Sequence, residues 1–97
     1  MERLSLKIRG IVQGVGFRPF IHKLVGSYGL RGYIKNTSSG VELELEGERA
    51  ELERFVRDVP EKAPKLAVIE SVEPEYSAEL VGFTGFEIRE SKREASR

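Results

Sequence analysis

The sequence predicts an α+β domain in which two helices pack on one face of a mostly antiparallel sheet. Two segments have the spacing of amphipathic helices, and the remaining apolar residues alternate with polar ones as in half-buried strands. Their order is strand, helix, strand, strand, helix, strand, with a short extra strand at the end. This is the split βαβ order of the ferredoxin-like sandwich. A chain of 97 residues is long enough for one such domain with one core.

The first half of the chain predicts a strand, a glycine-rich loop and a helix. The strand covers residues 4–11, where Leu4, Leu6 and Ile8 alternate with polar side chains. Pro19 suits the first turn of a helix, and Gly29 lies where that helix is expected to end. Between them, apolar residues follow helical spacing at Phe20, Ile21, Leu24, Val25 and Tyr28.

A hairpin is expected next. Residues 30–35 form one strand, "NTSSG" forms the turn, and residues 41–46 form the returning strand. In the returning strand Val41, Leu43 and Leu45 alternate with Glu42, Glu44 and Glu46. We expect this row of glutamates to be a solvated strand face and not an acid–base pair.

The second half completes the predicted fold. A helix over residues 48–59 places Ala50, Leu52, Phe55, Val56 and Val59 on one face, and the two prolines of "PEKAPKL" are expected to end it. A strand over residues 68–76, a loop over 77–85 and a short strand over 86–91 follow. We expect the domain to span residues 1–91 and residues 92–97 to be a charged tail or the start of a linker.

Composition excludes several classes of function. Sixteen Lys and Arg balance sixteen Asp and Glu, which argues against a nucleic-acid partner or an acidic membrane surface. The chain has no cysteine and one histidine, so we expect no metal site and no cofactor. No apolar run is long enough to span a membrane, and the N-terminus lacks the apolar core of a signal peptide. The cytoplasm is therefore the expected location.

The segment "GIVQGVGFRPF" is the main candidate site. Glycines between a strand and a helix let successive amide groups turn inward, and the helix start adds free amides and a positive dipole end. The amides of residues 15–18 are placed to bind a phosphate-sized dianion, and the Arg18 side chain adds a planar fork of donors. The alternative is a tight strand–helix connection with an exposed arginine.

Two other phosphate-binding motifs do not fit this loop. A Walker A loop ends in Gly-Lys-Ser/Thr, whereas Gly16 is followed by Phe17 and Arg18. The dinucleotide fingerprint requires glycine at the position of Pro19. No pair of carboxylates has a spacing typical of a Mg²⁺ site. Phosphate chemistry here is therefore expected to be metal-free and to use a good leaving group.

Asn36 is the second candidate. It enters the hairpin turn, where an ordinary Asx turn is the alternative, but an amide there can orient a water molecule. Gln13 lies at the rim of the loop and can bond to loop backbone or to substrate. Thr37 is a candidate support for Asn36 or simply a turn residue. We expect His22 to be an exposed or packed helix residue, and Phe17 and Phe20 to anchor the loop to the core.

The segments "GIVQGVGFRPF", "GLRGYIKNTSSGVELELEG", "AVIESVE" and "GFEIRES" resemble the acylphosphatase family across nearly the whole chain. The resemblance implies a split βαβ sandwich in which Arg18 and the loop from Gln13 through Gly14, Val15, Gly16 and Phe17 hold phosphate. It also implies that Asn36 positions the nucleophilic water. Arg18 and Asn36 would be the catalytic residues.

The version "GVGFRPF", with "GVELELEG" and the ending F-x-I-R-x-S, is most similar to the N-terminal acylphosphatase-like domain of the HypF carbamoyltransferases. These enzymes act in nickel–iron hydrogenase maturation and use carbamoyl phosphate and ATP. The resemblance implies hydrolysis of carbamoyl phosphate by one domain of a longer polypeptide, whose remaining domains would be its partners. The alternatives are a stand-alone acylphosphatase and a non-catalytic domain that binds a small anion.

Overall fold

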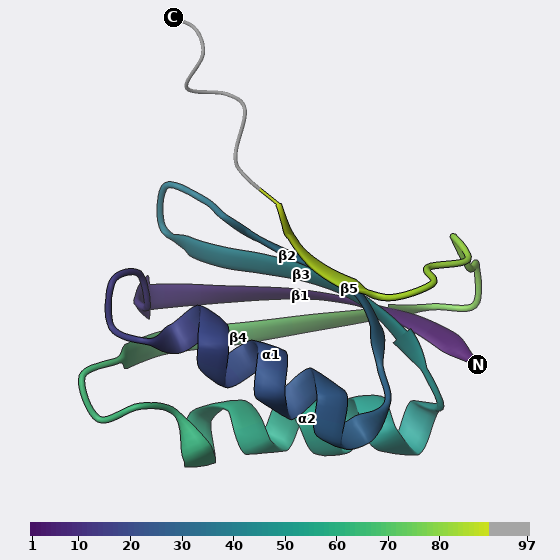
Figure 1. Cartoon of the computed structure of the whole chain (residues 1–97), viewed down its shortest axis with the longest axis horizontal. Coiled ribbons are helices and arrows are strands. Elements are labelled where there is room, and N and C mark those ends of the chain that lie inside the picture. The colour runs from purple at the N-terminus through teal and green to yellow at the C-terminus, as the bar shows by residue number, and fades with distance from the viewer. Residues whose placement is uncertain (90–97) are drawn as a thin grey trace, which may run out of the picture.

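The computed structural model describes residues 1–89 and contains a five-stranded sheet with two helices on one of its faces (Figure 1). This confirms the predicted fold class. Residues 90–91 of the expected last strand and the expected tail at 92–97 lie outside the described residues. In chain order the elements are β1 (Glu2–Ile11), α1 (Phe17–Tyr28), β2 (Arg31–Asn36), β3 (Gly40–Gly47), α2 (Arg49–Lys62), β4 (Val68–Ser77) and β5 (Phe86–Arg89).

The strands lie in the order β4-β1-β3-β2-β5. All neighbouring pairs are antiparallel except β2 and β5, which run parallel along one edge of the sheet. β1 therefore lies between β3 and β4, and its C-terminal end reaches the same end of the sheet as the turn between β2 and β3. Figure 1 shows the loop before α1 and this turn at the same end of the molecule.

The core lies between the sheet and the helices. Alternate residues of β1, β2 and β3 point toward α1 and α2, as the period-two pattern predicts. Removal of this apolar surface from water is the main stabilising contribution. The buried apolar side chains are Leu4, Leu6, Ile8, Val12, Phe17, Ile21, Leu24, Val25, Leu30, Ile34, Val41, Leu43, Leu45, Leu52, Phe55 and Val59.

The predicted end of α1 is confirmed, whereas α2 ends inside the predicted breaking segment but beyond its first proline. α1 ends at Gly29, whose φ of 64° is left-handed, and the Leu30 amide closes the turn on the Val25 carbonyl at 3.1 Å. α2, however, continues through Pro60 to Lys62. Pro60 lies in the last turn of α2, where its missing N–H removes a single hydrogen bond. Only Glu61 and Lys62 follow it in the helix.

The prediction of a solvated glutamate row is wrong for Glu46. Its side chain is only 3% exposed, because the segment between β4 and β5 folds over it. The amides of Val81, Gly82 and Phe83 all donate to its carboxylate, Phe83 at 3.0 Å. Glu44 is half-buried and accepts a hydrogen bond from the Ser5 hydroxyl at 2.7 Å. A strand's alternation shows which residues share a face but not what covers that face.

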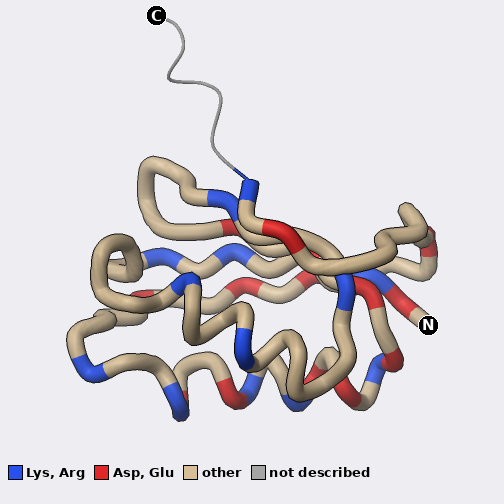
Figure 2. Tube along the Cα trace, viewed as in Figure 1, with Lys and Arg blue, Asp and Glu red and all other residues tan. Residues whose placement is uncertain are grey.

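Charge is distributed evenly over the described fold. Positive and negative residues are interspersed along the described part of the chain (Figure 2). On the sheet face away from the helices, Lys7 of β1 pairs in register with Glu42 of β3 on one side and Glu73 of β4 on the other. This pattern matches the zero net charge.

Candidate functional site

The loop between β1 and α1 has the backbone conformation of an anion-binding nest. Gly14 and Gly16 have φ angles of 74° and 80°, values that residues with a Cβ rarely adopt. The loop is fixed to the core at both ends, because Val12 and Phe17 are each 1% exposed. Alternation of left-handed and right-handed residues turns successive N–H groups to one side. The glycines therefore shape a concave row of amides on a rigid base.

The start of α1 leaves its amides available. The N-cap residue is Gly16, which provides no side-chain hydrogen bond, and the first turn contains no acidic residue. The first intrahelical bond runs from the Phe20 amide to the Gly16 carbonyl at 3.3 Å. Within residues 1–89 we find no hydrogen bond from the amides of residues 14–16. These donors and the positive end of the helix dipole are suited to an anion.

Arg18 is the second residue of α1, and its side chain is exposed. In the described part of the chain the Arg18 guanidinium forms no ion pair. The loop before it, residues 10–17, carries no charge and is tan in Figure 2. Arg18 therefore offers a cation beside the nest, and its planar fork of donors matches the oxygens of a phosphate group.

Asn36 is the last residue of β2 and is paired with Val41 of β3. The oxygen of its side chain, Oδ1, is enclosed by protein and has no hydrogen-bond partner among residues 1–89. A buried carbonyl oxygen without a partner carries an unfavourable desolvation cost. This acceptor lies at the end of the sheet that carries the nest, and a rotation of the side chain out of its covered position would open it to a water or ligand.

The turn after Asn36 is closed by its own backbone. The Thr37 amide donates to the Gly40 carbonyl at 2.9 Å, and the Thr37 hydroxyl accepts from the Ser39 amide at 3.3 Å. We find no hydrogen bond between the side chains of Thr37 and Asn36 in the described structure. The Thr37 hydroxyl therefore holds the turn, which was one of the two expectations for it.

Gln13 joins the nest to this turn. Its side-chain nitrogen donates to the carbonyls of Thr37 and Gly40, each at 2.9 Å. The sequence predicted bonding to loop backbone or to substrate, and the backbone bonded is that of the β2–β3 turn. No signal in the sequence identifies these partners, because they lie 24 and 27 residues away. The connection brings the two candidate elements side by side.

The remaining candidates have structural roles. His22 is exposed and lies edge-to-face against Phe86 of β5, with ring centroids 5.7 Å apart. Phe17 and Phe20 pack on each other at 5.6 Å and anchor the start of α1 to the core. Residues 1–89 contain no cluster of three His, Cys, Asp or Glu side chains arranged to hold a metal ion. Over the same residues, no helix combines the length and apolar character needed to cross a membrane.

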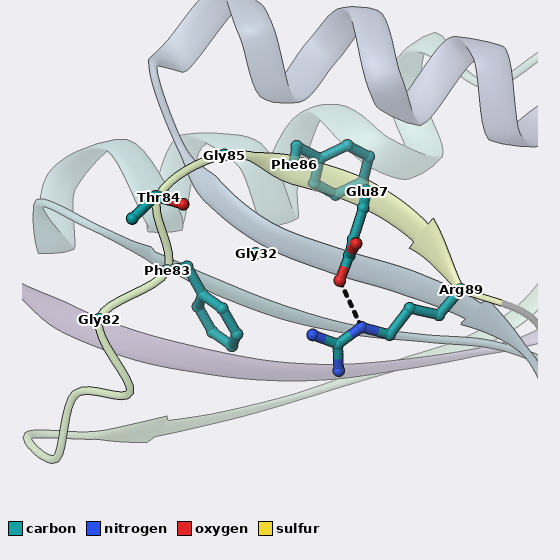
Figure 3. Close-up of a pocket in the computed structure, with 8 residues that line it drawn as sticks. All are labelled: Gly32, Gly82, Phe83, Thr84, Gly85, Phe86, Glu87 and Arg89. Atoms are coloured by element: carbon teal, nitrogen blue, oxygen red, sulfur yellow. Dashed lines mark hydrogen bonds and ion pairs between the residues drawn. The ribbon is translucent and has the colours of Figure 1, made fainter.

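A hollow lies beside β5 and the loop that precedes it (Figure 3). Its volume is about 390 Å³, and its wall includes Gly32, Phe83 and Phe86. The charged groups at its rim are paired, because Arg89 Nε donates to Glu87 at 2.6 Å (Figure 3). The nest differs from it in offering amides and a guanidinium that no described residue occupies. The nest is therefore the better candidate for a doubly charged anion.

The fold and the loop together define a split βαβ domain with a glycine-rich strand–helix loop suited to an anion. The family model for acylphosphatase matches residues 4–88, and the chain belongs to this family. This confirms the resemblance seen in the sequence.

Relatives of the chain are of two kinds. It is 40% identical over 91 residues to the carbamoyltransferase HypF2 of Cupriavidus necator, covering 94% of this chain and 11% of HypF2. A crystal structure of full-length HypF in its phosphate- and nucleotide-bound form superposes with a TM-score of 0.85 at 37% identity, over 94% of this chain and 12% of HypF. The acylphosphatase of Bacillus subtilis superposes with a TM-score of 0.86 at 30% identity, over 92% of this chain and 99% of that enzyme. The chain thus spans about a tenth of the HypF proteins and nearly all of a small acylphosphatase.

Proposed function

We propose that this chain hydrolyses acyl phosphates to a carboxylate and inorganic phosphate. The observation that carries the proposal is the nest before α1, where Gly14 and Gly16 shape a row of available amides beside the exposed Arg18. Membership in the acylphosphatase family supports the same reaction class. The substrate binds with its phosphoryl group in the nest and its acyl group directed outward.

The nest stabilises the transition state. As the P–O bond to the acyl group lengthens, charge spreads over the three phosphoryl oxygens. Fixed amides and the Arg18 guanidinium offer donors to these oxygens without having to reorganise during the reaction. The leaving carboxylate is stable as an anion, so the step requires no strong general acid.

Asn36 orients the attacking water. Once the side chain turns out of its covered position, its oxygen accepts a hydrogen from the water and its nitrogen can donate to the substrate. Alignment of the water with the breaking P–O bond removes orientational freedom before the reaction. Neither Asn36 nor Arg18 is a base near neutral pH, so the proton passes from the water to a phosphoryl oxygen of the substrate itself.

Carbamoyl phosphate is the proposed physiological substrate, with the chain acting as the acylphosphatase domain of a carbamoyltransferase. Its identity to HypF2 and its superposition on full-length HypF support this assignment. A stand-alone acylphosphatase is the second candidate. Its superposition on the Bacillus subtilis acylphosphatase, with a TM-score of 0.86, supports this second candidate.

The test is release of phosphate from carbamoyl phosphate and from benzoyl phosphate. Wild type is compared with Arg18→Ala and Asn36→Ala, and with Ser27→Ala as a control, whose hydroxyl donates to the Lys23 carbonyl on the exposed side of α1. Turnover retained by Ser27→Ala and lost by the other two variants would support the proposal. A clear preference for carbamoyl phosphate would support the carbamoyltransferase assignment, and equal use of both substrates would favour the stand-alone enzyme.

Absence of turnover in wild type would contradict the proposal. If phosphate then still raised the unfolding temperature of wild type, and not that of Arg18→Ala, the chain would be a non-catalytic anion-binding domain. Turnover that survives in both Arg18→Ala and Asn36→Ala would place the chemistry elsewhere on the molecule.

A further inference from the structure

The Gln13 side chain uses both of its donors on the turn. A side-chain amide nitrogen carries two hydrogens, and Gln13 Nε2 lies 2.9 Å from both the Thr37 and the Gly40 carbonyl oxygens. Only the nitrogen can face two carbonyls, because the amide oxygen is itself an acceptor. The group left to face an incoming phosphate is therefore an oxygen, which an anion does not favour. The Gln13 side chain is thus unsuited to bind the substrate's phosphoryl group.

A second contact fixes the same turn to the end of β1. The Gly10 amide donates to the Ser39 carbonyl at 3.0 Å. The turn approaches β1 so closely that a Cβ on Gly40 would lie 1.9 Å from the Ile8 carbonyl oxygen. The Gly10 contact anchors the strand below the loop, whereas the Gln13 contact anchors the loop itself. Together they leave little freedom between the nest and the turn.

Through these contacts Gln13 connects the residue next to Asn36 with the first glycine of the nest. Asn36 directly precedes Thr37, one of the two residues that Gln13 holds, and Gly14 directly follows Gln13 in the nest. A shift of the turn relative to the loop would move the Asn36 amide relative to the phosphoryl group. We infer that Gln13 is a positioning residue, which holds the water-orienting Asn36 in register with the anion nest. This inference rests on the proposed function.

The role predicts a specific kinetic signature. Gln13→Met keeps the length of the side chain and removes both donors. Because the nest is untouched, KM and inhibition by inorganic phosphate should change by less than about two-fold. The value of kcat should fall roughly 10- to 100-fold, the range expected when a reacting group is misplaced by about 1 Å. Ser27→Ala serves again as the control and should keep the wild-type kcat.

A double-mutant cycle separates positioning from an independent effect. If Gln13 acts through Asn36, its removal should matter little once Asn36 is gone. Gln13→Met in the Asn36→Ala background should therefore lower the residual kcat by less than about three-fold. Wild-type kcat in Gln13→Met, or a full loss repeated in the Asn36→Ala background, would overturn the inference. So would a loss confined to KM, because that result would make Gln13 a substrate ligand.

Amide hydrogen exchange tests the contact without turnover. The Thr37 amide, which bonds to the Gly40 carbonyl, should exchange faster in Gln13→Met than in wild type, while amides in the centre of β3 should not change. If wild type showed no turnover, the proposed function would fail, and this exchange result would still decide whether Gln13 holds the turn. Unchanged exchange of the Thr37 amide would overturn the contact itself.

Discussion

The Arg18 side chain is exposed and forms no ion pair within residues 1–89. Its contribution to the proposed catalysis should depend on the geometry of its donors as well as on its charge. Arg18→Lys keeps the positive charge but replaces a planar fork with a single ammonium group. We expect phosphate inhibition to weaken only modestly and kcat to fall by about 10²-fold, because fixed donors act mainly on the transition state. Steady-state kinetics with benzoyl phosphate measures both. Equal kcat in wild type and Arg18→Lys would show that charge alone suffices.

Glu46 gives the stability of the fold a dependence on pH. Burial alone would raise the pKa of its carboxyl group, but hydrogen bonds from the Val81, Phe83 and Gly82 amides hold this pKa below its usual value. A folded-state pKa below the unfolded value of about 4.3 stabilises the fold at neutral pH. This contribution disappears as pH falls through the folded-state pKa.

Glu46→Gln should therefore destabilise the protein at pH 7 by roughly 1–3 kcal/mol, since a charged acceptor is replaced by a neutral one whose nitrogen cannot accept from the same amides. The difference between wild type and variant should shrink as pH falls through the lowered folded-state pKa of Glu46, where the wild-type carboxylate takes up a proton. Urea unfolding at pH 7 and at lower pH measures this. A difference that does not change with pH would contradict the assignment.

Individual residues differed in how far the sequence revealed them. Arg18 was identified because its neighbours along the chain create its environment. Gln13 and Glu46 were not fully identified, since their partners come from segments more than 20 residues away. The alternation around Glu46 assigned the correct face of β3. It carried no information about the loop that covers this face.

At the scale of elements, substitution by alanine should have opposite effects on stability at two glycines. Gly26 lies within α1, where a Cβ would have open space around it, whereas a Cβ on Gly40 would lie 1.9 Å from the Ile8 carbonyl oxygen. Gly26→Ala should stabilise by about 0.5–1 kcal/mol, because alanine loses less backbone freedom in a helix. Thermal and denaturant unfolding measure the change.

Gly40→Ala should destabilise by about 2 kcal/mol or more, because β3 must move away from β1 to admit the methyl group. It should also lower kcat, since Gly40 accepts one of the Gln13 hydrogen bonds. Gly26→Ala is the control for both measurements. A Gly40→Ala protein with wild-type stability would mean that the strands separate there at little cost.

Element boundaries were predictable where one residue type determines the backbone. Gly29 ended α1 as expected, because a left-handed residue there is a general helix stop. Pro60 did not end α2, since a proline in the final turn removes only one hydrogen bond. The parallel pairing of β5 with β2 involves strands separated by two other strands and a helix. The pattern of the sequence gives the short strand but not its neighbour.

At the scale of the whole molecule, a ligand that binds only the folded state should stabilise it. Inorganic phosphate at 100 times its dissociation constant should add about 2.7 kcal/mol. In a domain of this size that corresponds to a rise of roughly 10–20 °C in the unfolding temperature. Arg18→Ala should lose most of this rise. An equal rise in both proteins would indicate binding at another surface.

The overall architecture could be predicted because local and global signals agree: strand and helix periods, loop glycines and the order of elements all favour one topology. What the sequence could not provide is the relative placement of loop and turn. That placement depends on how strands pack side by side, which no single segment encodes.

The parallel pairing of β2 and β5 has a practical consequence for handling the protein. Arg89 lies in register with Lys35, one residue before Asn36, so the described chain leaves the sheet at the end that carries the nest (Figure 1). Glu2 starts β1 at the opposite end, about 30 Å away along the ten-residue strand. An affinity tag, dye or surface anchor attached before Glu2 should leave the nest accessible. The same attachment placed directly after Arg89 would lie at the end of the sheet that carries the nest.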